Sequence, residues 1–329
     1  MLLDTILSAL LPMVVTFLLG FVAAWRHDFG SKDVPTLNRM VLLYAVPLAL
    51  FAGTVAATRE ELSQDIPLAI AMCVVIIGMY AVVFLLLRTA FRLQMSTSAL
   101  AALLASAPAV PFMGPAILGS LFGRPSAIPI ALAGLVINLT VVPVTILFLT
   151  LDPAGEDSQE NKPAKDGTKS ASTTASGSSV LVAKLAETVK TPIVWAPVFA
   201  FVIVLSGVHI SQLIVDALSL LGHASGGVAL FASGIVLASM KIKANRYVFL
   251  FVCLKNIVAP VLVLGGLRWL GYGNPIVSEA VVTMAIPAMP IALMLAVQYR
   301  VAEAEVASTV FLSVIGSVIT MGVFIALTR

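Results

Sequence analysis

The sequence predicts an all-α integral membrane protein with ten transmembrane helices, arranged as two inverted five-helix repeats in which helices 4 and 9 are broken and cross. Three observations predict this fold: the apolar composition, features that recur at a fixed offset, and a proline motif that occurs once in each half. Of the 329 residues, 60% are hydrophobic and 11% are charged, which is more apolar surface than a water-soluble globule can bury. The chain is therefore expected to fold in a lipid bilayer.

Ten apolar stretches supply the expected helices, because a spanning helix needs roughly 20 apolar residues. They are centred on residues 5–25, 39–58, 66–90, 96–121, 127–150, 192–208, 212–239, 247–270, 275–298 and 305–327. The first stretch has no basic region before it and no small-residue cleavage pattern after it, so we interpret it as helix 1 and not as a signal peptide. Cys73 and Cys253 fall in mid-helix, where we expect small buried residues and no disulfide framework.

A polar segment divides the chain into two halves. Residues 152–180 are rich in Ser, Thr, Gly and Lys, a composition that predicts a disordered cytoplasmic linker. The linker separates a first repeat, residues 1–151, from a second repeat, residues 181–329. Most of the 19 Lys and Arg residues fall in loops on the side of this linker, so the positive-inside bias predicts that both termini lie outside.

The two halves match at an offset of 180 residues without gaps. The matched features are Pro12 with Pro192, Phe21 with Phe201, Cys73 with Cys253, and the Ala-Leu-Phe-Ala runs that begin at Ala49 and Ala229. Because each half has an odd number of helices, the second half must enter the membrane upside down. The sequence therefore predicts an inverted repeat with a pseudo-two-fold axis in the membrane plane.

The motif Pro-Ala-x-Pro occurs at residues 108–111 and again at 287–290, inside the fourth and ninth stretches. Two prolines three residues apart remove backbone hydrogen bonds and clash with preceding carbonyls, so each motif predicts a broken helix, with a simple kink as the alternative. Backbone N–H and C=O groups without a helical partner are tolerated in a membrane only where they are buried in protein or line a cavity. A broken helix at the corresponding position of each repeat is typical of secondary transporters. The substrate-binding residues expected at the breaks are Ser106, Pro108, Ala109, Val110, Pro111, Thr283, Pro287, Ala288, Met289 and Pro290.

Lys255, beside Asn256, is a charged side chain near the middle of an apolar stretch. Burying an ammonium group in lipid costs about 2.5 to 3.5 kcal/mol on the mildest scale, so we expect it to face the protein interior. There it could bind an anion, exchange a proton or neutralise carbonyl ends at the helix crossing; the alternative is a lysine that snorkels to the surface. Asn138 could bind a carboxylate or bond a neighbouring helix, whereas Asn38 is interpreted as an interfacial or packing residue.

Several of these residues together resemble the auxin efflux carrier family of permeases, specifically its bacterial malonate or dicarboxylate transporters. The resemblance covers the chain outside the linker. It rests on Leu37-Asn38 with Ala45-Val46-Pro47-Leu48-Ala49-Leu50-Phe51, on Pro111-Phe112-Met113-Gly114-Pro115 with Leu121-Phe122-Gly123, and on Ala285-Ile286-Pro287 with Leu295-Ala296 and Tyr299.

The resemblance implies a fold related to bile-acid and sodium/proton transporters. Helices 1, 2, 6 and 7 would form a scaffold, often dimeric, and helices 3–5 and 8–10 a moving transport domain. Members of the family commonly place an asparagine beside the crossover prolines, but this chain has Ala107, Ala109 and Ala288 there. That departure assigns anion binding to backbone N–H groups, Ser106, Thr283 and Lys255.

The function expected from these features is secondary active transport of a small organic anion, malonate-like by resemblance, in a bacterial inner membrane. Coupling to a proton or sodium and potential-driven uniport stay open. The alternatives are a bile-acid or sodium/proton type symporter or antiporter, which would need carboxylates at the crossover, and an intramembrane enzyme, which would need paired acids, a Ser-His pair or metal ligands. We expect no enzyme activity, cofactor, metal or nucleic-acid partner, and a homodimer through the scaffold.

Overall fold

The computed structural model describes residues 2–30, 32–55, 66–123, 127–152, 192–208, 210–239 and 245–328, and within these ranges every regular element is a helix. The elements before residue 153 are α1 (Leu2–Trp25), α2 (Val34–Met40), η1 (Val41–Ala45), α3 (Val46–Val55), α5 (Ile66–Thr89), α6 (Met95–Ser106), α7 (Val110–Phe122), α8 (Ala127–Val136), η3 (Ile137–Val141) and α9 (Val142–Leu151). Those after it are α11 (Pro192–Leu205), α12 (Gln212–Ser239), α13 (Arg246–Cys253), η5 (Leu254–Val258), α14 (Ala259–Trp269), α15 (Ile276–Ala285), α16 (Ile291–Tyr299) and α17 (Glu303–Leu327).

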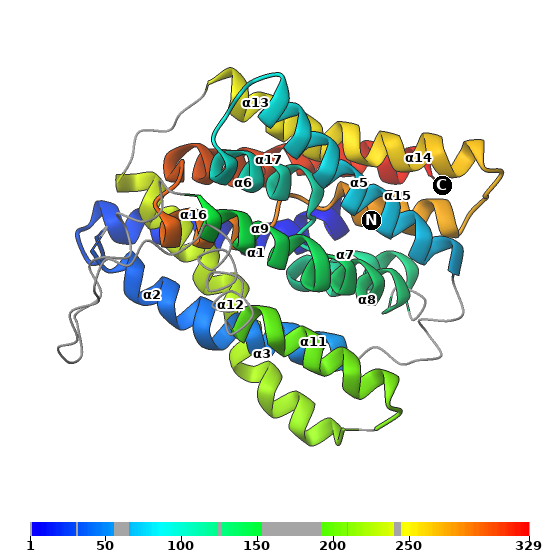
Figure 1. The fold of residues 1–329 in the computed structure, drawn as a ribbon, viewed down its shortest axis with the longest axis horizontal. Helices are drawn as coiled ribbons and strands as arrows, with labels where there is room; N and C mark the ends of the chain where they lie inside the picture. Colours follow the sequence, from blue (N-terminus) through cyan, green and yellow to red (C-terminus); the bar gives the residue numbers. More distant parts are fainter. Residues whose placement is uncertain are drawn as a thin grey trace, which may run out of the picture.

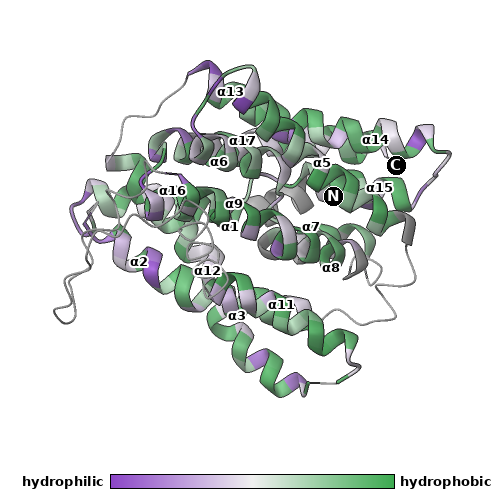
Figure 2. Ribbon diagram, viewed as in Figure 1, coloured by the Kyte–Doolittle hydropathy of each residue, from purple (hydrophilic) through white to green (hydrophobic). Residues whose placement is uncertain are grey.

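The described helices have the length and composition of a multi-pass membrane protein. Six of them, counting continuous runs of adjoining elements, are long and apolar enough to cross a bilayer. Figure 2 shows hydrophobic residues along the helices and hydrophilic residues near helix ends and connections. Large apolar side chains such as Leu220, Trp269 and Ile319 are exposed on the outer surface, as expected for a surface that contacts lipid. Cys73 and Cys253 are also exposed, so the expectation that they are buried is wrong.

The polar linker predicted for residues 152–180 lies outside the described residues, except for Asp152. That residue is buried, and its carboxylate accepts a hydrogen bond of 2.8 Å from the backbone N–H of Ser96 in the first turn of α6. Asp152 is therefore part of the folded helical structure.

In the described residues three π-helical turns occur within the long helices, and each ends two residues before a proline. The prolines are Pro47 after η1, Pro143 after η3 and Pro260 after η5. A proline within a helix lacks the N–H of the regular ladder and its ring crowds the preceding turn, and a wider turn of backbone relieves that crowding. Each of these π turns thus lies directly before a proline, whereas Pro12 in α1 and Pro197 in α11 lie within continuous α-helix.

The helices fall into two groups by their most extensive contacts. The first, which we call the α12 group, contains α1, α2, η1, α3, α11 and α12; the second, the α17 group, contains α5 to α9 and α13 to α17 with their π turns. Figure 1 shows α2, α3 and α11 on one side of the molecule, away from α13, α14 and α17. The groups also touch each other, for example through the stacked rings of Phe17 and Phe311, whose centroids lie 4.8 Å apart.

Side-chain contacts also define two ends of the molecule. At the Asp152 end, the hydroxyl groups of Thr150 and Tyr299 lie 3.1 Å apart, which places the last turns of α9 and α16 together. At the Thr328 end, Nδ2 of Asn274 donates to the carbonyl oxygen of Thr328 at 2.7 Å, which joins the approach to α15 with the last turn of α17.

Candidate functional site: the crossing of two broken helices

Both Pro-Ala-x-Pro motifs interrupt a helix. The first break separates α6, which ends at Ser106, from α7, which begins at Val110; the second separates α15, which ends at Ala285, from α16, which begins at Ile291. The residue before a proline is disfavoured in the α conformation, and Ala107 and Ile286 are accordingly extended, with ψ of 110° and 136°. The structure thus shows interrupted helices and not two continuous kinked ones.

The two breaks lie against each other and pair through their backbones. Pro108 and Ala288 form an isolated antiparallel bridge. The N–H of Ala109 donates to the carbonyl oxygen of Pro287 at 2.9 Å, and the N–H of Met289 donates to that of Ala107 at 3.2 Å. Since an unpaired backbone group inside a membrane costs several kcal/mol, each break stabilises the other.

Four half-helix ends therefore meet at one buried point. The carbonyl ends of α6 and α15 and the amide ends of α7 and α16 all lie next to the bridge. Helix N-termini carry partial positive charge and attract anions, whereas C-termini attract cations. Ala107, Ala109, Ala288 and Met289 have no exposed surface, so the crossing is closed in this structure.

Lys255 meets the carbonyl end of the second break. Its Nζ donates to the carbonyl oxygen of Met284, in the last turn of α15, at 2.6 Å, and the side chain is fully buried. The snorkelling alternative is thereby excluded. At the offset of 180 residues the position in α5 that matches Lys255 is Val75. The lysine beside the second break therefore has no counterpart at the matching position of the first repeat.

Asn256 and Ser313 hold the second break from another direction. The Ser313 hydroxyl donates to Oδ1 of Asn256 at 2.6 Å and accepts the N–H of Ala288 at 2.9 Å, while Nδ2 of Asn256 donates to the Ser313 carbonyl oxygen at 2.8 Å. All three residues are buried. This network joins η5, α17 and the break in one connected set of hydrogen bonds.

The hydroxyls predicted to bind substrate bond their own helices. Ser106 donates to the carbonyl oxygen of Ala102 at 2.8 Å, and Thr283 donates to that of Glu279 at 2.6 Å. Both side chains are fully buried beside the breaks. Each hydroxyl can rotate and can also accept hydrogen bonds through its lone pairs. In another conformation it can therefore bond a different partner.

The remaining predicted residues divide into two places. Pro108, Val110, Pro287 and Pro290 are buried at the crossing, and of Pro111 the structure describes the backbone in the first turn of α7. Asn138 lies buried in η3, and its Oδ1 has no hydrogen-bond partner among the described residues.

The backbone donors expected to bind an anion are partly occupied. The N–H groups of Ala109, Ala288 and Met289 all donate to protein oxygens, so they are not free ligands in this conformation. An anion at the crossing would have to exchange with these partners or use the amide ends of α7 and α16. The sequence predicted free backbone amides at an alanine-lined crossing. That expectation is corrected: in the closed crossing these amides are paired.

Sequence reasoning overlooked Ser313 and interpreted Asn38 as an interfacial or packing residue. Asn38 donates through Nδ2 to the carbonyl oxygen of Met294 in α16 at 2.9 Å, and its Oδ1 has no partner. A shared signal was present in the sequence: Asn38, Asn138 and Asn256 each lie four to nine residues before the proline that follows a π turn. Asn138 and Asn256 lie within π turns, which are frequent at functional sites, and Asn38 lies in α2 three residues before one.

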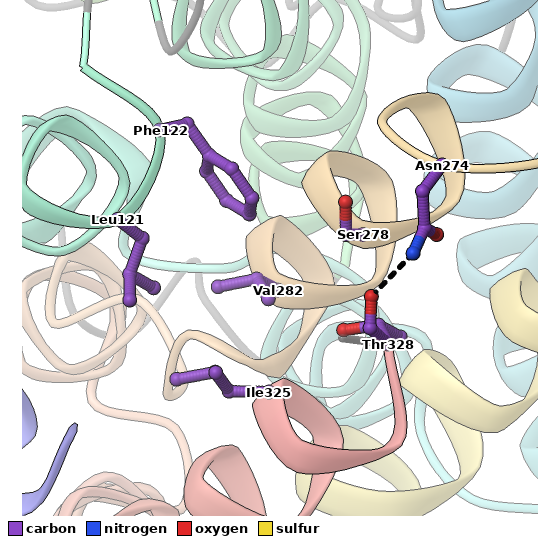
Figure 3. A pocket seen from close by; sticks show the side chains of 7 residues that line it. All are labelled: Leu121, Phe122, Asn274, Ser278, Val282, Ile325 and Thr328. Carbon is purple, nitrogen blue, oxygen red and sulfur yellow. Dashed lines mark hydrogen bonds between the residues drawn. The ribbon is translucent and has the colours of Figure 1, made fainter.

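A cavity of about 220 Å³ lies at the Thr328 end, apart from the crossing. It is lined by Leu121, Phe122, Asn274, Ser278, Val282, Ile325 and Thr328. In Figure 3 the apolar side chains lie mainly on one side and the polar ones on the other. None of the residues predicted to bind substrate lines this cavity, although Val282 is only one turn before the break.

Acidic and metal-binding side chains are sparse in the described part of the chain. It contains no group of three or more His, Cys, Asp or Glu side chains placed to hold a metal ion. The charged side chain that reaches the crossing is a lysine, whose donor chemistry suits oxygen acceptors.

The known proteins that resemble this chain are membrane transporters. Residues 5–325 match the model of a family described as membrane transport protein. The chain belongs to this family. This confirms the resemblance to auxin efflux carriers. Over 326 residues the chain is 28% identical to proteins named "uncharacterized transporter YfdV" from Escherichia coli strain K12, Escherichia coli O157:H7 and Shigella flexneri, covering 97% of this chain and 96% of each relative.

Proposed function

We propose that this membrane transport protein is a secondary active transporter of a small organic anion, a malonate-like dicarboxylate, which it binds at the crossing of the two broken helices. The observation that carries the proposal is the backbone bridge between Pro108 and Ala288, deep inside an all-helical membrane protein. Paired breaks at membrane depth are maintained where a binding site needs polar backbone, because in plain helix packing they only add cost.

The groups around the crossing favour an anion over a cation. Two helix N-termini converge there, and Lys255 adds a buried side-chain donor. A sodium- or proton-coupled transporter of the bile-acid or antiporter type would be expected to bring carboxylates to this point. The described residues offer the lysine and amides instead.

Alternating access supplies the mechanism in this proposal. The α12 group serves as the scaffold, and the α17 group, which carries both breaks, moves against it. The two halves are inverted five-helix repeats of a ten-helix fold, with residues 1–151 and 181–329 as the repeats. The protein resides in a bacterial inner membrane with both termini outside, and the scaffold forms the dimer contact.

The closed crossing supports an occluded resting state in this cycle. The amides of Ala109, Ala288 and Met289 and the side chains of Ser106, Thr283 and Lys255 all donate to oxygens of the protein in this conformation. Substrate carboxylates would replace these internal acceptors when the crossing opens.

Uptake of radiolabelled malonate into proteoliposomes tests the proposal. We expect saturable uptake that shorter and longer dicarboxylates compete for, and imposed proton, sodium and potential gradients will assign the coupling. Empty liposomes provide the control. If neither malonate nor any other carboxylate is taken up under any gradient, the proposed substrate class is wrong.

A further inference from the structure

Asn38 forms a hydrogen bond across the boundary between the two helix groups. It lies in α2 of the α12 group, is 1% exposed, and donates through Nδ2 to the carbonyl oxygen of Met294 in α16 of the α17 group. The same Nδ2 lies 3.4 Å from Oε1 of Gln298, one turn further along α16. One amide thus contacts two successive turns of the half-helix that follows the second break.

Seven other interhelical side-chain hydrogen-bonded pairs between described residues lie within the α17 group. They join Lys255 to Met284, Asn256 to Ser313, Ser313 to Ala288, Asp152 to Ser96, Thr150 to Tyr299, and Asn274 to Thr328, with Thr145 to Tyr80 at 3.0 Å as a further case. Such bonds can persist while the α17 group moves as a unit. The bond of Asn38 cannot, because its two ends belong to different groups.

The position of this contact is next to the crossing, at the Asp152 end. Met294 lies three residues after the start of α16, about 4.5 Å along the helix axis. Gln298 directly precedes Tyr299, which contacts Thr150 at that end. The cavity lined by Asn274, Ser278 and Thr328 lies at the opposite, Thr328 end.

The amide of Asn38 is only half satisfied. Its Oδ1 is buried without a hydrogen-bond partner among the described residues, although a buried amide oxygen normally has one. A contact that leaves this acceptor unused is weaker than a fully paired amide. It can therefore open without a large penalty, as an element that alternates between two conformations must.

We propose that Asn38 is a latch that holds the Asp152 end closed and that releases α16 each time the crossing opens toward that end. The inference rests on the proposed alternating-access function, since only a moving α17 group requires the contact to break. It assigns Asn38 a role in the transport cycle without contact to substrate.

Reversible cross-linking tests the latch directly. Cys73 and Cys253, both exposed, are first replaced by serine, and Asn38→Cys is combined with Gln298→Cys. Bridging this pair with a short bis-methanethiosulfonate, which forms a disulfide with each cysteine and releases sulfinate, should reduce malonate uptake at least about tenfold, and reduction of these disulfides should restore it. The matched control is Thr150→Cys with Tyr299→Cys, a hydrogen-bonded pair at the same end but within the α17 group; its cross-link should leave uptake within twofold. Undiminished uptake by the bridged Asn38→Cys/Gln298→Cys protein would overturn the latch.

A second measurement does not depend on the substrate. In the same cysteine-free background, Ala288→Cys reports access to the crossing through its rate of reaction with a membrane-impermeant thiol reagent added at the Asp152 side. Asn38→Ala should raise that rate by about two- to tenfold, the range expected from loss of one hydrogen bond. Equal rates with and without Asn38→Ala would contradict the latch even if malonate is transported. A raised rate without malonate uptake would keep the latch and reject the proposed substrate.

Discussion

Lys255 and Ser313 show how single side chains maintain a break in a helix inside a membrane. The lysine donates to the carbonyl end of α15, and the serine accepts the N–H of Ala288 within the break itself. Burial of an ammonium group costs several kcal/mol, and one hydrogen bond recovers only part of that cost. A chain selected for stability alone would gain from an apolar residue at position 255, which argues that the lysine is kept for transport.

Replacing Lys255 with methionine separates these two roles. Lys255→Met removes the buried charge but leaves the Met284 carbonyl oxygen without its side-chain donor, so we expect little loss of thermal stability and at least about tenfold slower malonate uptake. Thermal denaturation in detergent and uptake by proteoliposomes measure the two effects. The control is Arg268→Met, an exposed residue of the same helix, which should change neither. Full uptake by Lys255→Met would show that the lysine is not required.

Ser313→Ala should destabilise the protein because it leaves two buried groups unpaired, the Ala288 N–H and Oδ1 of Asn256. Each is expected to cost about 1–3 kcal/mol, which thermal denaturation can detect as a lower midpoint. Ser317→Ala, one turn further along α17, removes a hydroxyl that bonds only its own helix and should cost less than about 1 kcal/mol. Equal midpoints for the two variants would mean that Ser313 does not support the break.

At the scale of helices, proline and glycine determine the arrangement. Prolines end α6 and α15 and follow each of the three π turns, whereas glycines allow α1 and α12 to touch. A Cβ atom on Gly20 would lie 2.0 Å from the carbonyl oxygen of Phe231, and one on Gly234 would lie 2.1 Å from that of Phe17. Backbones this close need residues without side chains, as in other small-residue helix interfaces in membranes.

Gly234→Ala therefore should force α1 and α12 apart. Because the obstructing atom is backbone, it cannot rotate away, and we expect a loss of about 3 kcal/mol in stability. Gly227→Ala in the same helix meets no atom within 4 Å and should leave stability unchanged or raise it by up to about 1 kcal/mol. The stability of both variants is measured by thermal denaturation in detergent. A Gly234→Ala protein that is as stable as the wild type would refute the close contact between α1 and α12.

Much at this scale could be predicted from the sequence. Apolar stretches and proline motifs mark the helices and both breaks because they act through local backbone chemistry. The pairing of Pro108 with Ala288 was expected only as a crossing, and the occupation of its amides was not expected. The bond from Asn38 to Met294 joins residues 256 positions apart, and no local pattern specifies such a partner. The exposure of Cys73 and Cys253 likewise depends on which helix face meets lipid, which composition alone does not give.

At the scale of the whole molecule, the structure combines a buried crossing, an apolar outer surface and two helix groups that Asn38 joins through a hydrogen bond to Met294. The breaks and the residues that support the second one belong to the α17 group, whereas the close α1–α12 contact holds the α12 group together. This division fits a mechanism in which one group carries the site and the other stays fixed. Its central claim is that substrate binds where the two breaks meet.

Substrate protection of a cysteine at the crossing tests that claim most directly. With Cys73 and Cys253 replaced by serine, the rate of thiol labelling is measured for Ala288→Cys and, as a control, for Ser278→Cys in the cavity at the Thr328 end. We expect saturating malonate to slow labelling of Ala288→Cys at least about tenfold and to leave Ser278→Cys unchanged, since a bound anion displaces the reagent only at its own site. Labelling of Ala288→Cys at the same rate with and without malonate, or protection confined to Ser278→Cys, would contradict a substrate site at the crossing.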